Sequence, residues 1–429
     1  MAYRLPFTKL LHHPTRNLLI LIFGSHFHAL DTSTGALIST TRTLVSSSSP
    51  DNDNTNTFIS NFELDSIQPK YTIPSTDIHQ ATIRTLAFHV NISSLNPSAL
   101  LATSDENKIL KVWDCDKWIL KSSRPVPKRV MAISFNKDGS QIVTADKFGD
   151  VYSHPLDPPD DKHNVSTLLL GHVSMVTDMV ITPNNKYVIT CDRDEHIRIS
   201  KFPKGYNIES YCLGHNQFVS KIHILPWAMD LLVSAGGDDF IALWDYVSGR
   251  LLQTVNIKEI IEEKKSDDNK EAMDLDPEDS LEIAVTSITS SPISHHIALT
   301  IEKFPGIIIF NWNETEKKIQ YVQTLTLSID PLDLAYDIGG NLWVSNFIKE
   351  KQNNGSLITV FKKSGNEYEE VSKDHSLVEQ INKYGTMTVE NLPDLYTTNQ
   401  LRKNPVDWKE QKNERDVIQS EGENYATTS

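Results

Sequence analysis

The 429-residue sequence has few cysteines and lacks the glycine patterns of nucleotide-binding enzymes. Its three cysteines are too few, and odd in number, for a disulfide framework, which favours a reducing intracellular compartment. No two of the 17 glycines are separated by a single residue, so the Gly-x-Gly of a dinucleotide fold is absent. A P-loop and a Gly-x-Ser-x-Gly elbow are also missing. These absences argue against the common nucleotide-dependent enzymes and hydrolases.

Long hydrophobic runs and basic residues are scarce as well. The longest early apolar run, 18–23, is shorter than the about 7–15 residues of a signal-peptide core or the about 20 of a transmembrane helix. It predicts a buried strand, and we expect no membrane contact. The 41 Lys and Arg against 56 Asp and Glu give a net charge of −15. This balance argues against binding nucleic acid over the whole surface, although it is compatible with a local basic patch.

Two similar segments indicate that the chain is built from a repeat. Each contains a Gly-His pair, and the two histidines, His172 and His215, lie 43 residues apart. This spacing is within the about 40–45 residues of a WD-repeat propeller blade. A turn followed by a strand-like run recurs four times, and its last residues, spaced 39, 48 and 44 apart, are Trp113, Tyr152, Ser200 and Trp244. Because one blade cannot bury its own faces, the repeat predicts a propeller.

The rest of the chain fits the same architecture. Short β-rich runs between turn clusters predict an all-β fold, and residues 3–45, 283–325 and 330–363 supply three more blades, for a total of seven. The predicted seven-bladed WD-repeat propeller covers 1–394, with low-complexity insertions at about 46–57 and 262–280 that we expect to be solvated loops. A polar, flexible tail is predicted at 395–429. We expect the first strand to complete the last blade, because this removes exposed edges.

Several polar residues fit the hydrogen-bonded network of a WD blade, in which a His before the first strand bonds an Asp in a tight turn. The predicted members are His172, Asp194 and Ser200 in one unit, His215, Ser234, Asp238 and Trp244 in the next, and Asp146. A His-Asp acid-base pair is the competing interpretation, and a cryptic catalytic site stays open. The Cys-x-x-His spacing of Cys212 and His215, near Cys191, has no second ligand pair to support a metal site. We expect no catalytic, cofactor or metal site.

Two charged stretches are candidates for binding. The strand pattern of 192–198 places Ile197 on one face and charges of both signs on the other, as expected of a partner-docking patch or of a solvated face. The basic residues of the second stretch could contact RNA phosphate or lie in a solvated loop, and they are Lys121, Arg124, Lys128 and Arg129.

Four strings carry a more specific resemblance: 146–153 (DKFGDVYS), 170–178 (LGHVSMVTD), 192–200 (DRDEHIRIS) and 234–239 (SAGGDD). In this order they resemble the non-catalytic WD-repeat subunit of tRNA (guanine-N7-)-methyltransferases, in a fungal form. The resemblance is close over roughly 130–250. Outside it, only the propeller pattern and the short tail element 401–403 fit.

The resemblance implies a scaffold in a heterodimer. The catalytic partner would bind S-adenosylmethionine and methylate N7 of guanosine 46 in the tRNA variable loop, while this chain would hold no cofactor and would meet tRNA through the complex. The implied interface has Arg198 foremost, as a donor to a partner carboxylate, then Glu195 and Arg193, with Lys147 on the neighbouring blade. The family implies a nuclear location, with some cytoplasmic protein. A WD-repeat scaffold of another assembly, such as ribosome biogenesis or ubiquitin ligation, and an enzyme in its own right are the alternatives.

Overall fold

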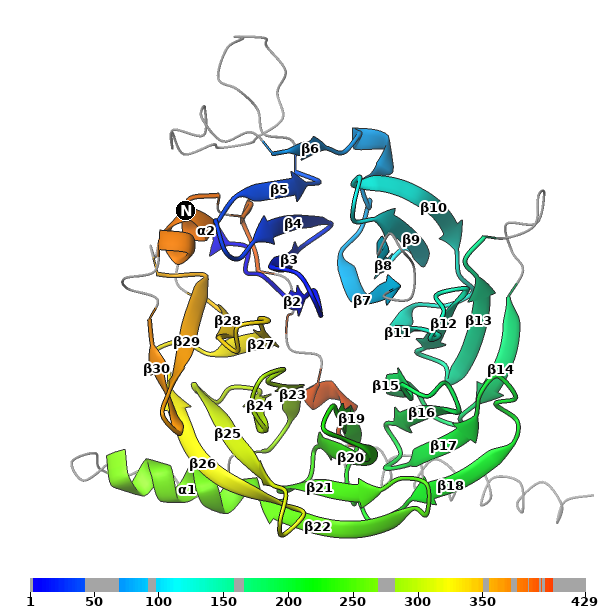
Figure 1. The fold of residues 1–429 in the computed structure, drawn as a ribbon, viewed down its shortest axis with the longest axis vertical. Helices are drawn as coiled ribbons and strands as arrows, with labels where there is room; N and C mark the ends of the chain where they lie inside the picture. Colours follow the sequence, from blue (N-terminus) through cyan, green and yellow to red (C-terminus); the bar gives the residue numbers. More distant parts are fainter. Residues whose placement is uncertain are drawn as a thin grey trace, which may run out of the picture.

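The computed structural model describes residues 3–42, 69–91, 98–157, 166–268, 282–349, 355–371, 376–384, 386–392, 395 and 398–403. Seven sheets stand side by side in a ring around a central opening (Figure 1). Consecutive strands pair antiparallel, and the first strand of each sheet lies innermost. The prediction of an all-β, seven-bladed WD-repeat propeller is therefore confirmed.

Each blade is one continuous meander of four strands, and blade 1 gains a fifth short strand that runs parallel to β5. Blade 1 contains β2 (Lys9–His12), β3 (Leu18–Phe23), β4 (His26–Asp31), β5 (Leu37–Thr40) and β6 (Tyr71–Thr72). Blade 2 contains β7 (Ile83–Asn91), β8 (Ser98–Asp105), β9 (Ile109–Asp114) and β10 (Ile119–Pro125). Blade 3 contains β11 (Val130–Phe135), β12 (Gln141–Asp146), β13 (Asp150–Pro155) and β14 (Thr167–Gly171). Blade 4 contains β15 (Val176–Ile181), β16 (Tyr187–Asp192), β17 (Ile197–Lys201) and β18 (Ile208–Cys212).

The remaining blades follow the same order. Blade 5 contains β19 (Val219–Leu225), β20 (Ala228–Gly236), β21 (Phe240–Asp245) and β22 (Arg250–Asn256). Blade 6 contains β23 (Val285–Ser290), β24 (His296–Ile301), β25 (Gly306–Asn313) and β26 (Lys318–Thr326). Blade 7 contains β27 (Pro331–Tyr336), β28 (Leu342–Asn346), β29 (Ile358–Ser364) and β30 (Glu367–Glu370).

The hydrophobic core lies between neighbouring blades. The second strand of a blade is the most deeply buried, as in β3, where all six residues of the predicted strand 18–23 are buried. Outer strands alternate exposed and covered positions, as in β10. The cluster around Ile199 and Trp244 joins blades 4 and 5, which shows how each blade buries a face that it cannot cover alone.

The ring closes differently from the prediction. The first strand, β1 (Tyr3–Arg4), pairs antiparallel with β31 (Thr388–Val389) near the other end of the described chain. It does not join blade 7, which takes all four of its strands from 331–370. Blade 7 therefore has its own outer strand, β30, and leaves no vacancy for a strand from the N-terminus.

Side chains hold blades 1 and 7 together instead. The backbone N–H of Leu10 in β2 donates to the Asp333 carboxylate of β27 at 2.9 Å, and Lys9 lies 3.7 Å from the same carboxylate. Apolar residues of both blades share one cluster with Val378 and Ile381 of helix α2 (Ser376–Tyr384). Closure thus depends on a buried carboxylate and on hydrophobic packing between two complete sheets.

The insertions and helices complete the description. The insertion at 46–57 lies outside the described residues. The expectation of a solvated loop from residue 262 is wrong for its first part, because helix α1 (Ile257–Asp268) covers 262–268. Ile257 and Ile261 bury one side of α1 against blades 5 and 6, and this contact explains the helix. Short 3₁₀ helices lie at Ser75–Asp77 (η1) and Asn399–Leu401 (η3). Neither α-helix of the described chain is long and apolar enough to cross a membrane.

Candidate partner-docking surface

One face of the ring carries the turns between the second and third strands of each blade, which we call b–c turns. In blade 5 the predicted network is joined by hydrogen bonds. His215 Nδ1 lies 2.7 Å from the Asp238 carboxylate, and Nε2 lies 2.7 Å from the Ser234 hydroxyl. Trp244 Nε1–H donates to that hydroxyl at 2.8 Å. This buried chain fixes the connection into blade 5 against its b–c turn.

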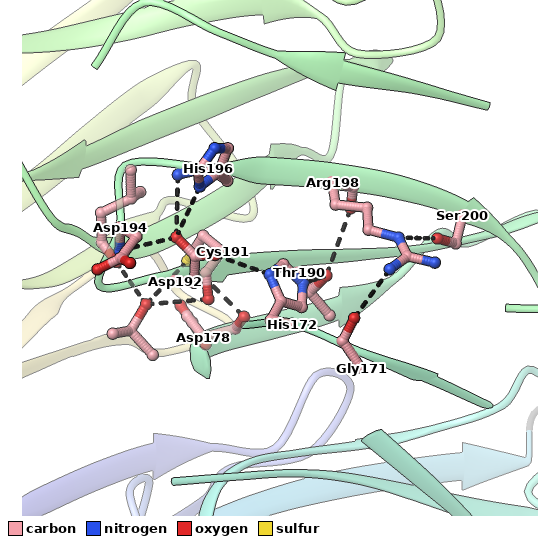
Figure 2. A network of polar contacts seen from close by, with 12 residues as sticks. Gly171, His172, Asp178, Thr190, Cys191, Asp192, Asp194, His196, Arg198 and Ser200 are labelled. Atoms are coloured by element: carbon pink, nitrogen blue, oxygen red, sulfur yellow. Dashed lines mark hydrogen bonds and ion pairs between the residues drawn. The ribbon is translucent and has the colours of Figure 1, made fainter. Parts of the chain in front are cut away.

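In blade 4 the partner of His172 is Asp192, which corrects the assignment to Asp194. His172 Nδ1 lies 2.8 Å from the Asp192 carboxylate, and Nε2 lies 2.7 Å from the Thr190 hydroxyl (Figure 2). Burial raises the pKa of Asp192, but the bonds from His172 and the His196 backbone outweigh it, so the net pKa is lowered. Ser200 occupies the position of the blade Trp and accepts a bond from Arg198 instead of joining the network.

The error has a local cause. The hydroxyl residue of the second strand and the closing residue of the third are ten apart in both blades, at Thr190–Ser200 and Ser234–Trp244. The Asp follows the hydroxyl residue by two positions in blade 4 and by four in blade 5. Gly236 stands at the earlier position in blade 5, two residues after Ser234. An Asp cannot replace it, because a Cβ there would lie 1.8 Å from the Phe218 carbonyl oxygen. Counting back from the end of the repeat therefore reaches the wrong Asp in blade 4.

Sequence reasoning missed a complete network in blade 2. His79 lies 2.9 Å from Asp105 and 2.8 Å from Thr103, and Trp113 donates to Thr103 at 3.0 Å. A usable signal was present: His79 precedes its first strand by four residues, as His172 does. The Gly-His pair itself is absent here, because Ile78 stands in place of the glycine.

Blade 3 lacks its histidine. Val126 stands four residues before β11, where the His would lie, and it is buried. Asp146 still forms its turn, since one carboxylate oxygen accepts from the backbone N–H groups of Phe148 and Asp150 at 2.8 and 3.1 Å. The other oxygen is buried without a partner in the described structure, and burial raises the pKa of Asp146. Blade 3 thus keeps the turn and loses the network.

In blades 2, 3 and 4 the third residue after the turn Asp adopts a left-handed backbone, with φ +64° at Lys108 in blade 2. Gly149 in blade 3 has φ +102°, and Glu195 in blade 4 has φ +76°. Glycine suits this conformation, whereas a side chain there costs on the order of 1 kcal/mol. Glu195 is therefore held in a strained position on the exposed turn of blade 4, a kind of site where strain often accompanies function.

Arg198 projects from β17 toward the connection between blades 3 and 4 (Figure 2). Its Nη1, Nη2 and Nε donate to Gly171 O, Gly205 O and Ser200 Oγ at 3.0, 2.9 and 2.9 Å. Burial lowers the pKa of this guanidinium. Its acceptors are all neutral, and no carboxylate within the described ranges forms an ion pair with it. Arg198 is a positioned, half-buried cation with unused N–H donors.

The b–c turn of blade 3 is linked to Arg198 through Gly171, which pairs with Asp150 and accepts a bond from Arg198. His172 N–H donates to Gly149 O at 2.9 Å, so the turn with Lys147 and Phe148 packs against the connection with Val173. Phe148 is 57% exposed and Val173 fully exposed at 104%. We call Lys147, Phe148, Val173, Arg193, Glu195 and Arg198 the blade 3–4 surface. Sequence reasoning had singled out its charges and not the two exposed apolar side chains, which are typical of an interface core.

The four residues of the predicted basic stretch differ in exposure and in contacts. Lys128 is exposed with its Nζ 4.7 Å from the centre of the Phe148 ring, and Lys147 Nζ lies 5.1 Å from it. Arg129 is half-buried beside them, with its carbonyl oxygen accepting from Lys147 N–H. Lys121 is exposed on outer strand β10. Arg124 corrects the prediction of an RNA contact, because it is 4% exposed and donates to Ser122 and to the Pro155 and Leu156 carbonyls.

The other two predicted interface residues contact the chain's own C-terminal segment. Arg193 Nε donates to Leu401 O at 2.9 Å. Lys403 Nζ lies 3.6 Å from Glu195 and 3.3 Å from Asp194. The sequence predicts a flexible tail from residue 395. Residues 398–403, which the structure describes, are instead held against the propeller. Residues 404–429 lie outside the described residues.

Comparison with solved structures agrees with the fold. U3-55K has a TM-score of 0.57 at 14% identity, covering 80% of this chain and 89% of that one. The RRP9 WD40 repeats give the same TM-score and identity, covering 80% and 88%. At this identity the likeness concerns the fold alone. Together with the three His-Asp networks, it defines the chain as a WD-repeat β-propeller.

Sequence comparison identifies the family within that class. Residues 68–167 and 159–367 match the tRNA methyltransferase TRM82 WD40 domain, and the chain belongs to this family. The tRNA (guanine-N(7)-)-methyltransferase non-catalytic subunit wdr4 of Danio rerio is 34% identical over 261 residues, 60% of this chain. The chain spans 59% of that relative's length. The non-catalytic subunit TRM82 of Meyerozyma guilliermondii is 30% identical over 319 residues, 71% of this chain and 74% of the relative.

Proposed function

We propose that this chain is the non-catalytic scaffold subunit of a heterodimeric tRNA (guanine-N7-)-methyltransferase. Its partner is the catalytic subunit, which binds S-adenosylmethionine and methylates N7 of guanosine 46 in the tRNA variable loop. The chain stabilises that subunit in its active arrangement and contributes a secondary contact to tRNA. The names of the relatives support the role of a non-catalytic subunit.

The single observation that carries the docking site is Arg198. It is held by three neutral acceptors, lacks a carboxylate partner in the described chain, and bonds Gly171 just before the connection that carries the exposed side chain of Val173. Such a surface fits a partner that presents a carboxylate beside an apolar patch, since charges set the register and apolar side chains supply most of the affinity.

The basic group around Phe148 supports the tRNA contact. Lys128 and Lys147 flank the exposed ring on a chain whose net charge is −15. The ammonium groups at the rim of this surface can meet phosphates, while the Phe148 ring itself packs against the catalytic subunit. Two lysines and one arginine make a small site, so most phosphate binding falls to the partner.

The test is co-expression with the guanine-N7 methyltransferase of the same genome, followed by measurement of N7-methylguanosine on tRNA. We expect activity to require this chain and to fall at least about tenfold with Arg198→Glu, because a carboxylate facing the new Glu is repelled. The control is Lys186→Glu, an exposed charge reversal in the turn between β15 and β16, at the opposite end of blade 4.

Each result has a defined meaning. The purified chain alone should neither bind S-adenosylmethionine nor methylate tRNA. A catalytic subunit that is stable and fully active without this chain would overturn the proposal. Equal activity of wild type and a folded Arg198→Glu variant would remove the docking site at Arg198. Activity that does not depend on the chain would leave a WD-repeat scaffold of another assembly as the better description.

We propose that the chain acts in the nucleus, with a smaller cytoplasmic fraction. The basis is the family alone, because the sequence carries no strong import signal of its own. Imaging of a fluorescent fusion checks this location, with and without the catalytic subunit. An exclusively cytoplasmic signal in both conditions would contradict it.

A further inference from the structure

The C-terminal segment 398–403 lies across three blades on the face that carries the b–c turns. Helix η3, drawn in orange-red, sits beside β19 and β23 near the central opening (Figure 1). Its Leu401 carbonyl meets Arg193 of blade 4, and the side chain of Arg402 reaches the loops of blades 5 and 6. A stretch of six residues therefore connects three consecutive sheets that are otherwise separate.

Arg402 fills a site whose chemistry matches a guanidinium. Nη2 donates to Ile283 O at 2.6 Å and to Gly237 O at 3.3 Å, and Nη1 donates to Gln217 Oε1 at 3.3 Å. The guanidinium carbon lies 5.7 Å from the centre of the Phe218 ring, within the range of a cation–π contact. Only 21% of the Arg402 side chain is exposed.

A carboxylate completes this site. Glu282 Oε2 lies 3.6 Å from Arg402 Nε. Carbonyl oxygens, an aromatic face and a carboxylate in one place suit the Nη groups, the weakly hydrated surface and the charge of an arginine. Nε has the Glu282 carboxylate nearby as an ion pair and forms no hydrogen bond in the described structure. A lysine ammonium has neither the fork nor the flat face, so the site selects arginine over lysine.

The residues on either side of Arg402 engage the charged turn of blade 4. Leu401 O accepts from Arg193 Nε, and Lys403 Nζ lies within 3.6 Å of both Asp194 and Glu195. Two adjacent carboxylates repel each other, and Glu195 also has a left-handed backbone. A cation between the carboxylates offsets the repulsion and favours one arrangement of the turn.

We propose that the loops of blades 5 and 6 form an arginine-binding site whose resident ligand is Arg402 of the same chain, and that the bound segment holds the turn 193–196 in the conformation that docks the catalytic subunit. This inference rests on the proposed function. A turn already ordered in the free subunit loses less conformational entropy on association, which raises affinity. Arg402 acts through the turn and is a positioning residue.

The contacts indicate that the segment supports docking of the catalytic subunit and does not block it. The segment contacts Arg193, Asp194 and Glu195. The three bonds of Arg198 go instead to Gly171 at the end of blade 3 and to Ser200 and Gly205 in blade 4. The leading docking residue therefore stays free of the segment while the turn beside it is fixed. A competitor for the partner would instead cover Arg198.

The experiment uses the full-length chain with Arg402→Ala and Arg402→Lys. Arg250→Ala, an exposed arginine at the opposite face of blade 5, is the matched control. Hydrogen exchange of 193–196 is measured in the free chain, and affinity is measured with the purified catalytic subunit. We expect Arg402→Ala to speed exchange at 193–196 and to weaken binding about tenfold. Arg402→Lys should have nearly the same effect, and Arg250→Ala none.

Lys403→Glu is the second variant, in case Arg402→Ala perturbs the whole fold. It leaves the arginine site filled and places a third carboxylate beside Asp194 and Glu195, so exchange of the turn should rise without a change in the unfolding midpoint. Unchanged exchange in both variants, or tighter binding after Arg402→Ala, would overturn the proposal. If the wild-type chain binds no catalytic subunit, the proposed function fails, while the exchange data still decide whether the segment orders the turn.

Discussion

His172 Nδ1 lies 2.8 Å from the carboxylate of Asp192, and two residues further along the chain Asp194 faces Lys403 on the surface. The two carboxylates therefore have different roles, although they lie in one short turn. Asp192 accepts bonds from His172 and from the N–H groups of Asp194 and His196, whereas Asp194 makes a half-exposed ion pair.

Replacing these two carboxylates should have unequal effects on stability. Asp192→Ala should lower the free energy of unfolding by about 2–4 kcal/mol, because it leaves a buried histidine and two backbone N–H groups without acceptors. Asp194→Ala should change it by less than about 0.5 kcal/mol, as for most exposed ion pairs. Urea unfolding of both variants measures the difference. Equal losses would show that the network does not stabilise blade 4.

Ring closure can be tested at Asp333. Asp333→Ala removes the acceptor for Leu10 N–H between blades 1 and 7 and should cost about 1–3 kcal/mol. Asp333→Asn should cost less, because an amide oxygen can still accept that bond. Thermal unfolding of the two variants checks the order. If Asp333→Asn were as damaging as Asp333→Ala, the Lys9 ion pair rather than the Leu10 bond would carry the closure.

The buried His154 predicts a loss of stability in acid. Burial, with a smaller contribution from Arg124, lowers the pKa of His154 to about 4, below the 6.5 of an exposed histidine. The fold thus favours neutral His154, so its contribution is complete above pH 6.5 and is lost as the pH falls toward 4. A shift of this size corresponds to about 3 kcal/mol.

The variant that checks this pH dependence is His154→Gln. Its free energy of unfolding should fall less between pH 6.5 and 4 than that of the wild type. Parallel pH profiles for wild type and His154→Gln would show that His154 does not contribute to the acid sensitivity.

The exposed apolar side chains of the blade 3–4 surface should contribute to binding and not to folding. Phe148→Ser and Val173→Ser should each weaken binding to the catalytic subunit by about 1–2 kcal/mol, the effect of losing one apolar contact in an interface core. Unfolding midpoints should stay the same. Ile119→Ser, at a 51% exposed residue at the opposite face of blade 2, should change neither. Unaltered binding by both Phe148→Ser and Val173→Ser would move the interface elsewhere.

Features that repeat along the chain could be predicted from the sequence, whereas contacts between distant residues could not. The seven blades follow from repeats of local turn and strand patterns, because each blade is formed by a continuous piece of chain. The blade 2 network was missed although His79 has the expected spacing from its strand. Its detection needed the offset between His and strand rather than a Gly-His pair.

The candidate site divides in the same way. Arg193, Glu195 and Arg198 could be singled out because they fall in one string that resembles a known family. The burial of Arg124 was invisible, since it depends on carbonyl groups of 155 and 156 in the neighbouring blade. Phe148 and Val173 were also missed, because a single apolar residue in a turn has no periodicity that tells an exposed position from a buried one.

The sequence by itself determined the propeller, the number of its blades and the family, because these are written in short strings and their spacing. The tertiary structure alone decided which Asp bonds His172, how blade 7 meets blade 1, and where 398–403 binds. The physical reason is range. Strand alternation and turn chemistry act over a few residues, whereas Asp333 meets Leu10 and Leu401 meets Arg193 across more than 200 positions, in contacts that exist only once the ring has formed.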